Sequence, residues 1–359
     1  MSRIDATRPD SPRLAGPGPH GVGVQSLTLT DAARGRALAV ELWYPAAPGT
    51  VPGGAYATLL RDGVTPVTLH GRAARGAGAA EGRWPLVLLS HGYPGNRVLM
   101  AHLAEALASR GYLVAAADHP GSTYDHQAPF GETLLHRPLD QRFLLEALGQ
   151  HPLAEPGVAA IIGYSMGGYG ALVTAGAVLA PEMAGHDMAP PGGVLAVHCA
   201  PAALPANLRA VIAIGPWGHA RGLWSEGAFA AVRLPLMVMA GSLDETSGYA
   251  AMRAIAEGAR GCLLTFENAG HNAAAPIPAP AESHAHSERL GWAPFLHYAD
   301  AVWDSVRMNA LAQHFACAFL DRHLKGDAAA VPLLDAASAL GPEAGFAPGT
   351  AAGLRFEVF

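Results

Sequence analysis

The segment VAAIIGYSMGG, residues 158–168, decides how the rest of the chain is interpreted. Residues 158–162 are a short apolar run, as expected of a strand buried on both faces of a sheet. Residues 168–179 are predicted to be a helix, so a tight turn joins the two elements. That turn has the pattern G-x-S-x-G, and its two glycines remove the collision that side chains would cause in so sharp a reversal. We therefore predict that Ser165 has a strained backbone and presents its hydroxyl above a strand end.

Strand-like and helix-like runs alternate along most of the remaining chain. This alternation is typical of a mostly parallel sheet with helices on both faces, and two alternating runs near the N-terminus predict an antiparallel hairpin that extends it. We therefore predict an α/β fold. Strands are expected at residues 24–30, 38–44, 86–90, 113–117, 158–162, 211–214, 236–240 and 263–266, and helices at 98–109, 139–148, 168–179, 249–259 and 306–324.

The domain organisation follows from where this alternation begins and stops. Residues 1–20 are rich in Pro, Gly and Arg and are predicted to be a flexible N-terminus. Residues 21–327 are predicted to form one domain, with a connection of little periodicity at 45–83. Insertions at 180–205 and 272–298 follow sites of interest, and each is either a cap that walls a pocket or a solvated loop. Residues 328–359 are a low-complexity C-terminal tail that ends in a strand-like run.

Composition excludes several classes of protein. The net charge is -6 and the pI is near 6.3, with no long run of Lys or Arg, which argues against a nucleic-acid partner. No stretch approaches the ~20 apolar residues of a membrane span. The N-terminus is polar and lacks the apolar core of a secretory signal, so we predict a cytoplasmic location. The three cysteines are widely spaced and form neither a metal pattern nor a disulfide framework, which favours free thiols at Cys262 and Cys317.

A serine hydroxyl is a weak nucleophile until a base takes its proton and an acceptor orients that base. On a sheet of this kind the acid follows the serine in the chain and the base comes last. Asp244 lies just beyond the strand at 236–240, where a carboxylate would reach an imidazole. Glu245 is its nearest rival. Asp244 has an alternative role as the N-cap of the next helix.

His271 follows the strand at 263–266 and meets the requirements of chain order and loop position for the base. It has an alternative role as an ordinary surface histidine. The fallback candidates are His284, His286 and His297, which lie further along the insertion. The pair His284 and His286 resembles part of a metal site, but no carboxylate or cysteine spacing completes one, so we expect no metal.

The oxyanion of an acyl-transfer intermediate needs hydrogen-bond donors. The loop after the strand at 86–90 and the residue after the nucleophile supply backbone N–H groups on this fold, which indicates Tyr93 and Met166. The loop has an alternative role as a plain turn. The side chain of Tyr93 would then lie beside the scissile carbonyl as part of the substrate pocket. Trp217 follows the strand at 211–214 and either walls that pocket or belongs to the core.

At these residues the chain resembles the α/β-hydrolase-fold serine esterases related to dienelactone hydrolase and to platelet-activating-factor acetylhydrolase of bacteria. The resemblance covers about residues 22–327. It implies Ser165 as nucleophile, Asp244 as acid and His271 as base, but dienelactone hydrolases use cysteine, so lactone specificity does not carry over. It rests on LVLLSHGYPGN (86–96), GYLVAAADHPGSTYD (111–125), GYSMGG (163–168), AIGPWG (213–218), GSLDE (241–245), AGHN (269–272), and the segments 24–45 and 303–327.

A second resemblance is to cutinase-like polyester hydrolases, through Tyr93, Met166 and Trp217. The chain departs from them in its leading hairpin, its insertions and its long final helix. Together these patterns predict an enzyme that hydrolyses small-molecule carboxylic esters through an acyl-enzyme, without a cofactor. Since no anion receptor could be placed, neutral esters with short or medium acyl groups are expected. Polyester, lactone, thioester or amide cleavage on the same residues is an alternative, and so is a non-catalytic binding protein. The oligomeric state is not indicated.

Overall fold

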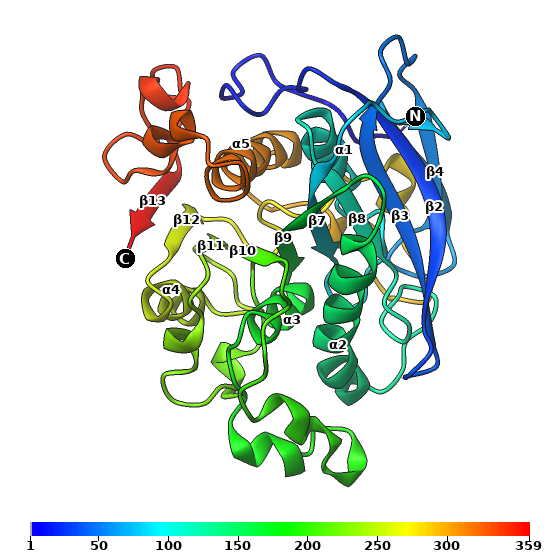
Figure 1. Cartoon of the computed structure of the whole chain (residues 1–359), viewed down its shortest axis with the longest axis vertical. Helices are drawn as coiled ribbons and strands as arrows, with labels where there is room; N and C mark the ends of the chain where they lie inside the picture. Colours follow the sequence, from blue (N-terminus) through cyan, green and yellow to red (C-terminus); the bar gives the residue numbers. More distant parts are fainter. Residues whose placement is uncertain (1) are drawn as a thin grey trace.

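The computed structural model describes residues 2–359. Its centre is a ten-stranded sheet in the order β13-β12-β11-β10-β9-β7-β8-β3-β2-β6 (Figure 1). The six neighbouring strands from β12 to β8 in this order are parallel. The chain places β8 on one side of β7 and the next strand, β9, on the other side, so the order of the strands reverses at this point. In α/β sheets such a switch point opens a crevice at the carboxyl edge. These strands are β7 (Trp84–Ser90), β8 (Leu113–Ala117), β9 (Ala154–Tyr164), β10 (Leu208–Ile214), β11 (Leu236–Gly241) and β12 (Cys262–Phe266).

Antiparallel strands extend this parallel centre on both sides. The predicted hairpin is present as β2 (Gly21–Asp31) and β3 (Arg36–Ala46), which pair along their full length, and β3 joins the sheet against β8. On the far side β13 (Leu354–Val358) pairs with β12, which accounts for the strand-like end of the chain. The short strand β6 (Ala74–Arg75) pairs with part of β2.

Helices cover both faces of the sheet because alternate strand residues point to opposite sides. Val87 and Leu89 of β7 belong to the core beneath α1 (Ala101–Ser109) and α5 (Ser305–Leu324). Leu86 and Leu88 belong to the core beneath the other three helices. These are α2 (Phe130–Gly149), α3 (Met166–Thr174) and α4 (Tyr249–Gly258).

None of the helices within residues 2–359 combines the length and apolar character that a bilayer crossing requires.

A second, three-stranded sheet takes two of its strands from the connection at residues 45–83, where the sequence showed little periodicity, and its third strand from the N-terminus. It has the order β1-β5-β4 and consists of β1 (Ser2–Arg3), β4 (Gly54–Leu59) and β5 (Pro66–Gly71). The expectation for residues 45–83 is therefore wrong. Val67 and Leu69 are buried and alternate with more exposed neighbours, which is a strand period. The Gly- and Ala-rich sequence around this short run conceals that period.

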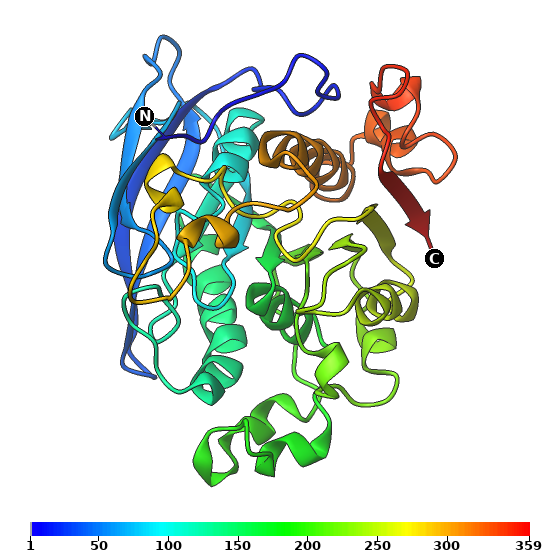
Figure 2. The same cartoon turned by 180° about the vertical axis from the view of Figure 1, so that it is seen from behind.

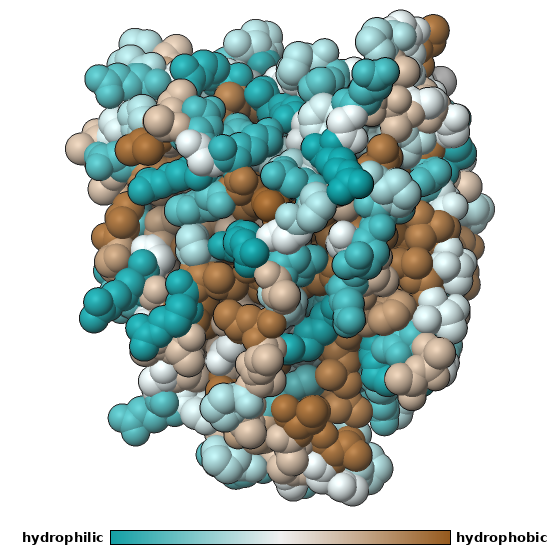
Figure 3. All heavy atoms as spheres, viewed as in Figure 1, coloured by the Kyte–Doolittle hydropathy of each residue, from teal (hydrophilic) through white to brown (hydrophobic). Residues whose placement is uncertain are grey.

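The two insertions lie in different parts of the molecule. Residues 180–205 contain the 3₁₀ helices η1 (Pro181–Gly185) and η2 (Pro191–His198), and His198 Nε2 lies 2.8 Å from the carbonyl oxygen of Leu135 on α2. This insertion lies at the lower end of the molecule in Figure 1, and Figure 3 shows hydrophobic residues at the surface there. Val194 and Val197 of the insertion are exposed. Residues 272–298, coloured yellow to orange in Figure 2, lie instead beside the N-terminal strands.

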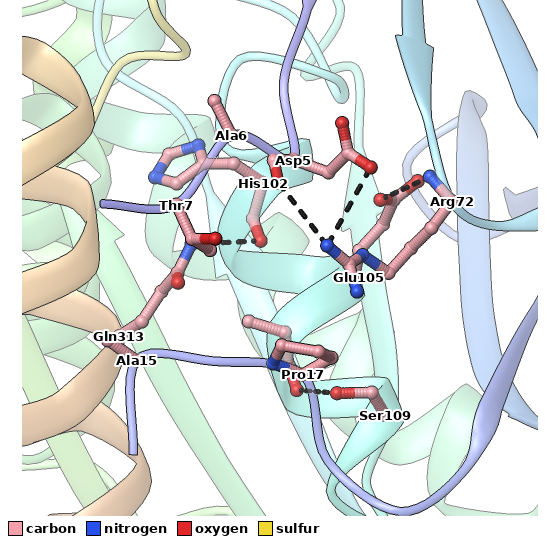
Figure 4. A pocket seen from close by; sticks show the side chains of 11 residues that line it. Asp5, Ala6, Thr7, Ala15, Pro17, Arg72, His102, Glu105, Ser109 and Gln313 are labelled. Atoms are coloured by element: carbon pink, nitrogen blue, oxygen red, sulfur yellow. Dashed lines mark hydrogen bonds and ion pairs between the residues drawn. The ribbon is translucent and has the colours of Figure 1, made fainter. Parts of the chain in front are cut away.

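The N-terminal segment packs against the body, which differs from the flexible N-terminus that its composition suggested. Met1 lies outside the described residues, but Ile4 is buried and its N–H donates to His70 O at 2.9 Å. Figure 4 shows Asp5 beside Arg72, with Glu105 of α1 next to them. The Arg72 guanidinium donates to the Asp5 carbonyl oxygen at 3.2 Å, and the Arg72 backbone N–H donates to Glu105 at 2.9 Å. These polar contacts hold a segment whose Pro and Gly content alone indicates disorder.

Candidate active site

Ser165 lies at the turn between β9 and α3, with a backbone φ of 52° and ψ of -110°. This is a strained conformation for a residue with a side chain. The flanking glycines are required by space. A Cβ at position 163 would lie 2.2 Å from Gly167 O, and a Cβ at position 167 would lie 1.9 Å from Ser90 O. The tight approach of α3 to the end of β7 therefore fixes where the serine hydroxyl points.

The structure brings Ser165, His271 and Asp244 together from the ends of three strands. Ser165 Oγ lies 2.9 Å from His271 Nε2, and His271 Nδ1 lies 2.8 Å from Asp244 Oδ2. With a proton on Nδ1, the imidazole donates to the carboxylate and its Nε2 accepts from the serine hydroxyl. Ser165 is 8% exposed and Asp244 is 3% exposed, so the pair of bonds is shielded from competing water.

The second oxygen of Asp244 holds the carboxylate in place. Asp244 Oδ1 accepts from the backbone N–H groups of Thr246 at 2.8 Å and Ser247 at 2.9 Å. Helix α4 begins later, with Gly248 at its N-cap, so Asp244 does not cap that helix. The rival Glu245 is exposed at the surface. The geometry therefore brings Asp244, and not Glu245, to the imidazole.

The fallback histidines are placed elsewhere or are differently bonded. His284 and His286 are exposed, and no metal-binding cluster exists among residues 2–359. His297 does line the same cavity as Ser165, but its Nε2 lies 2.9 Å from the hydroxyl of Tyr124. Burial, with help from the charge of Arg61, lowers the pKa of His297 to about 3. It is therefore a neutral ring that belongs to the cavity wall.

The backbone N–H groups of Tyr93 and Met166 are both unused by any acceptor within residues 2–359. Met166 is the first residue of α3, where the helix dipole favours negative charge. The loop that carries Tyr93 is in contact with the serine, since a Cβ at Gly92 would lie 3.4 Å from Ser165 Cβ. Two free donors therefore lie next to the serine, as an oxyanion requires.

A residue that the sequence gave no reason to select, Arg137 of α2, fixes the direction of one donor. It is 1% exposed, and its guanidinium donates to His91 O, to Gly92 O at 3.4 Å and to Ser122 Oγ at 2.7 Å. Burial lowers the pKa of Arg137 to about 9, so it is still cationic at neutral pH. In a trans peptide the C=O and the N–H point in opposite directions. A cation on Gly92 O therefore turns the N–H of Tyr93 away from Arg137.

A buried network of polar side chains lies beneath the loop that carries Gly92 and Tyr93. Ser90 Oγ lies 3.0 Å from His119 Nε2, and His119 Nδ1 lies 3.1 Å from Asp140. Asp140 also accepts from Arg34 at 2.8 Å and from Arg36 at 2.9 Å, both on the leading hairpin. Burial raises the pKa of Asp140, but hydrogen bonds from His119 and Arg36 outweigh burial and hold that pKa well below its usual value.

This network has the residue types of a nucleophilic site, yet Ser90 is fully buried, so it has no access to a substrate. Burial also lowers the pKa of His119 to about 4. The group is therefore structural. It ties the hairpin, α2 and the end of β7 into one unit beneath the oxyanion loop.

The serine opens into a cavity of about 250 Å³. One wall is aromatic, since Tyr93 packs edge-on against Phe130 and Phe130 packs edge-on against Trp217, with ring centroids 5.1 and 5.2 Å apart. Trp217 therefore lies in the pocket wall, the first of its two expected places. Other lining residues come from the second insertion and from the β4–β5 turn; they are Arg61, Asn272, Trp292, Leu296 and His297.

The first insertion contributes no lining residue to this cavity, within the part of the chain that the structure describes. Residues 272–298 therefore form part of the pocket wall, which is one of the two expectations for an insertion. Residues 180–205 pack against α2 instead, away from the serine.

Comparison with known proteins agrees with this architecture. A family model for the alpha/beta hydrolase fold matches residues 85–183, which span β7 to the region just after α3. The solved structure of the ferulic acid esterase from Streptomyces cinnamoneus is similar over 95% of this chain and 98% of that chain, with a TM-score of 0.63 and 21% sequence identity. No curated protein matches the chain. The chain has the α/β-hydrolase fold, as the sequence predicted, while the resemblance to the dienelactone-hydrolase-related esterases stays a prediction.

Proposed function

We propose that this α/β-hydrolase-fold protein hydrolyses carboxylic esters of small molecules, with Ser165 as nucleophile, His271 as general base and Asp244 as its orienting acid. The observation that carries the proposal is the continuous path of hydrogen bonds from Ser165 Oγ through His271 to Asp244, beside two unused backbone N–H groups. The similar solved structure is of an esterase, which supports the same reaction class.

In the first half of the reaction, Ser165 Oγ attacks the carbonyl carbon of the ester while its proton moves to His271 Nε2. The carbonyl electron pair moves onto oxygen and forms the oxyanion. The bond between the carbonyl carbon and the alkoxy oxygen then breaks. The proton on Nε2 goes to the departing alkoxide, so an alcohol leaves and an acyl-enzyme remains at Ser165.

In the second half, water takes the place of the alcohol. His271 Nε2 removes a proton from water, the resulting oxygen nucleophile attacks the acyl carbon, and the proton returns to Ser165 Oγ as the carboxylic acid leaves. The net change is ester plus water to acid plus alcohol. Asp244 keeps the imidazole in the tautomer that both halves need and stabilises the imidazolium.

The oxyanion forms twice, and the N–H groups of Tyr93 and Met166 are its proposed donors. Loss of one such donor typically costs about 3 kcal/mol of transition-state stabilisation. The donors belong to a helix N-terminus and to a loop fixed by the buried Arg137, so they need no reorganisation during the reaction. No step of this scheme uses a cofactor or a metal ion.

The size of the cavity and its aromatic wall favour short or medium acyl groups over a polymer chain. The expectation that the ester is neutral had one premise, that no anion receptor could be placed near the serine. Arg61 lines the same cavity, so that premise no longer holds. Thioester, lactone and amide cleavage use the same groups, and a substrate panel separates them. The predicted cytoplasmic location stays a prediction that cell fractionation would check.

The test is hydrolysis of p-nitrophenyl acetate and butyrate by the full chain. Ser165→Ala removes the attacking oxygen and is expected to lower kcat by roughly 10⁴-fold or more. A fluorophosphonate probe is expected to label the unchanged protein and not this variant. Ser26→Ala, at an exposed position of the hairpin, is the matched control and should keep full activity. Activity that survives in Ser165→Ala, or absence of labelling in the unchanged protein, contradicts the proposal.

A further inference from the structure

Arg61 is an unpaired cation in the cavity that Ser165 opens into. It lies in the turn between β4 and β5, and it lines the cavity together with Tyr93, Ser165 and His271. Its guanidinium makes no hydrogen bond and no ion pair with any residue from 2 to 359. The guanidinium carbon lies 6.0 Å from the centroid of the Trp292 ring, which gives it a cation–π contact.

No carboxylate of residues 2–359 lines the cavity beside that charge. The titratable side chains that line the cavity are Arg61, Tyr93, Tyr164, His271 and His297, and no Asp or Glu is among them. Arg61 is partly buried, and this burial lowers the pKa of its guanidinium because the cationic form loses part of its hydration. A partly desolvated cation without a partner is unfavourable, and an anion placed against it recovers that loss.

The adjacent carboxylate, Asp62, is fully occupied elsewhere. Its Oδ1 accepts from the backbone N–H groups of Val64 at 3.1 Å and Thr65 at 2.9 Å. Its Oδ2 accepts from Thr65 Oγ1 at 2.6 Å and from Ser287 Oγ at 3.1 Å. Asp62 therefore holds the turn in place and makes no ion pair with the neighbouring guanidinium of Arg61, which lines the cavity.

The turn itself is firmly placed. Leu60 N–H donates to Thr65 O at 2.9 Å, and Gly63 N–H donates to Leu60 O at 2.8 Å. Gly63 has a φ of +71° and packs so closely on Tyr124 that a Cβ would lie 2.2 Å from its carbonyl oxygen. A pre-positioned cation loses little conformational entropy when it binds a ligand.

We propose that Arg61 binds a carboxylate of the substrate, so that the preferred substrates are small esters that carry a second, ionised carboxyl group. A guanidinium donates two parallel N–H bonds to a carboxylate, which orients the ligand as well as holding it. A cavity of about 250 Å³ places that anion and the scissile carbonyl within one small molecule. This inference rests on the proposed function, because it names the substrate class of the same site.

Two substrate pairs test the inference and distinguish which half of the ester carries the charge. Monoethyl glutarate has a carboxylate on the acyl side, and ethyl 5-methylhexanoate replaces that carboxylate with an isopropyl group. 4-Acetoxybenzoate has a carboxylate on the alcohol side, and methyl 4-acetoxybenzoate is its neutral partner. In at least one pair we expect kcat/KM to be tenfold or more higher for the anion, mainly through a lower KM.

Arg61→Gln is expected to abolish this preference, because it lowers kcat/KM tenfold or more further for the anionic ester than for its neutral partner. Arg61→Lys should keep part of the preference, because lysine retains the positive charge but lacks the two parallel N–H donors of the guanidinium. Arg289→Gln, an exposed arginine of the second insertion, is the matched control. Equal rates within both pairs, or an equal loss on charged and neutral esters in Arg61→Gln, overturns the inference.

A binding measurement separates this inference from the proposed reaction. Glutarate and 4-hydroxybenzoate are titrated into the Ser165→Ala protein by calorimetry, with Arg61→Gln added on the same background. Binding that falls tenfold or more with the second substitution supports the anion subsite even if no ester is turned over. Absence of binding by both anions overturns the subsite. Absence of Ser165-dependent turnover for every ester refutes the proposed function alone.

Discussion

At the scale of single residues, Arg137 shows how a charge with no access to substrate affects the reaction centre. It donates to Gly92 O, the oxygen at the opposite end of the peptide whose N–H belongs to Tyr93. The positive charge polarises that peptide and keeps its N–H pointing away from the guanidinium. Under the proposed function Arg137 is thus a positioning residue for the oxyanion donor, and the element that provides it, α2, is remote in sequence from the loop it holds.

Arg137→Met is therefore expected to lower kcat by roughly 10- to 100-fold with little change in KM, because the donor remains but is less well oriented. Arg137→Lys should restore part of kcat. Steady-state kinetics on p-nitrophenyl butyrate, with thermal unfolding to check the fold, measures both. Arg142→Met on the same helix, whose guanidinium contacts Ala203 O at the surface, is the control. An unchanged kcat in Arg137→Met refutes the positioning role.

The residues of the site differ in how far sequence reveals them. Ser165, Asp244 and His271 follow strand ends in a fixed order, so local pattern and chain order select them. Arg137 and Arg61 carry no such pattern, because their roles depend on which carbonyl or cavity the tertiary structure places beside them. Trp217 was expected in the pocket wall, with the core as its alternative, and the packing of Phe130 against it in the cavity wall decides between the two.

At the scale of elements, the closest packing in the site is that of α3 against the end of β7. Helix and strand approach so tightly that Gly167 has no room for a methyl group beside Ser90 O. This approach delivers both Ser165 and the N–H of Met166. A substitution there acts on stability and on the oxyanion donors together.

Gly167→Ala is expected to lower the free energy of unfolding by about 1–3 kcal/mol or more, the usual cost of overpacking. It should also slow fluorophosphonate labelling of Ser165. Urea unfolding and labelling rate are the two measurements. Gly185→Ala in η1, where a Cβ would have no atom within 4 Å, is the control and should be close to neutral. If Gly167→Ala has the stability and the labelling rate of the unchanged protein, α3 moves to make room for the methyl group and the prediction is wrong.

Elements of strong local pattern were predicted well, and the others were missed for physical reasons. The strand at 113–117 has the bounds of β8, since a fully buried strand is a solid apolar run. Helix α2 begins at Phe130, well before the predicted 139. The structure accommodates Pro138 inside this helix, where a proline is normally unfavourable. The short strands β4 and β5 gain their stability from pairing with each other and with β1, which local sequence does not display.

At the scale of the whole molecule, several buried histidines make stability depend on pH. His102 of α1 is 2% exposed, and neither ring nitrogen has a hydrogen-bond partner within residues 2–359. Figure 4 shows it near Gln313, beside the polar contacts of Asp5 and Arg72. Burial lowers the pKa of His102 to about 3. The unfolded chain binds a proton at this residue below about pH 6.5, whereas the folded protein does so only near pH 3.

Stability is therefore lost as the pH falls from about 6.5 toward 3, at about 1.4 kcal/mol per pH unit for each such histidine. His102→Leu is expected to reduce the slope of unfolding free energy against pH by up to that amount between pH 4 and 6. Urea unfolding at a series of pH values measures the slope. His286→Leu, at an exposed histidine, should leave it unchanged. An identical slope in His102→Leu means that this ring is protonated in the folded state.

The salt bridges from the leading hairpin to Asp140 limit how far this chain can be trimmed. The segment that matches the family model, residues 85–183, contains the proposed nucleophile, both proposed donor peptides and Asp140, but not Arg34 or Arg36. A minimal version that began after the hairpin would keep a buried carboxylate whose two arginine counter-ions had been removed, which costs several kcal/mol. The hairpin thus stabilises the segment that carries the proposed site, and shortened or domain-shuffled versions would need a neutral residue at position 140.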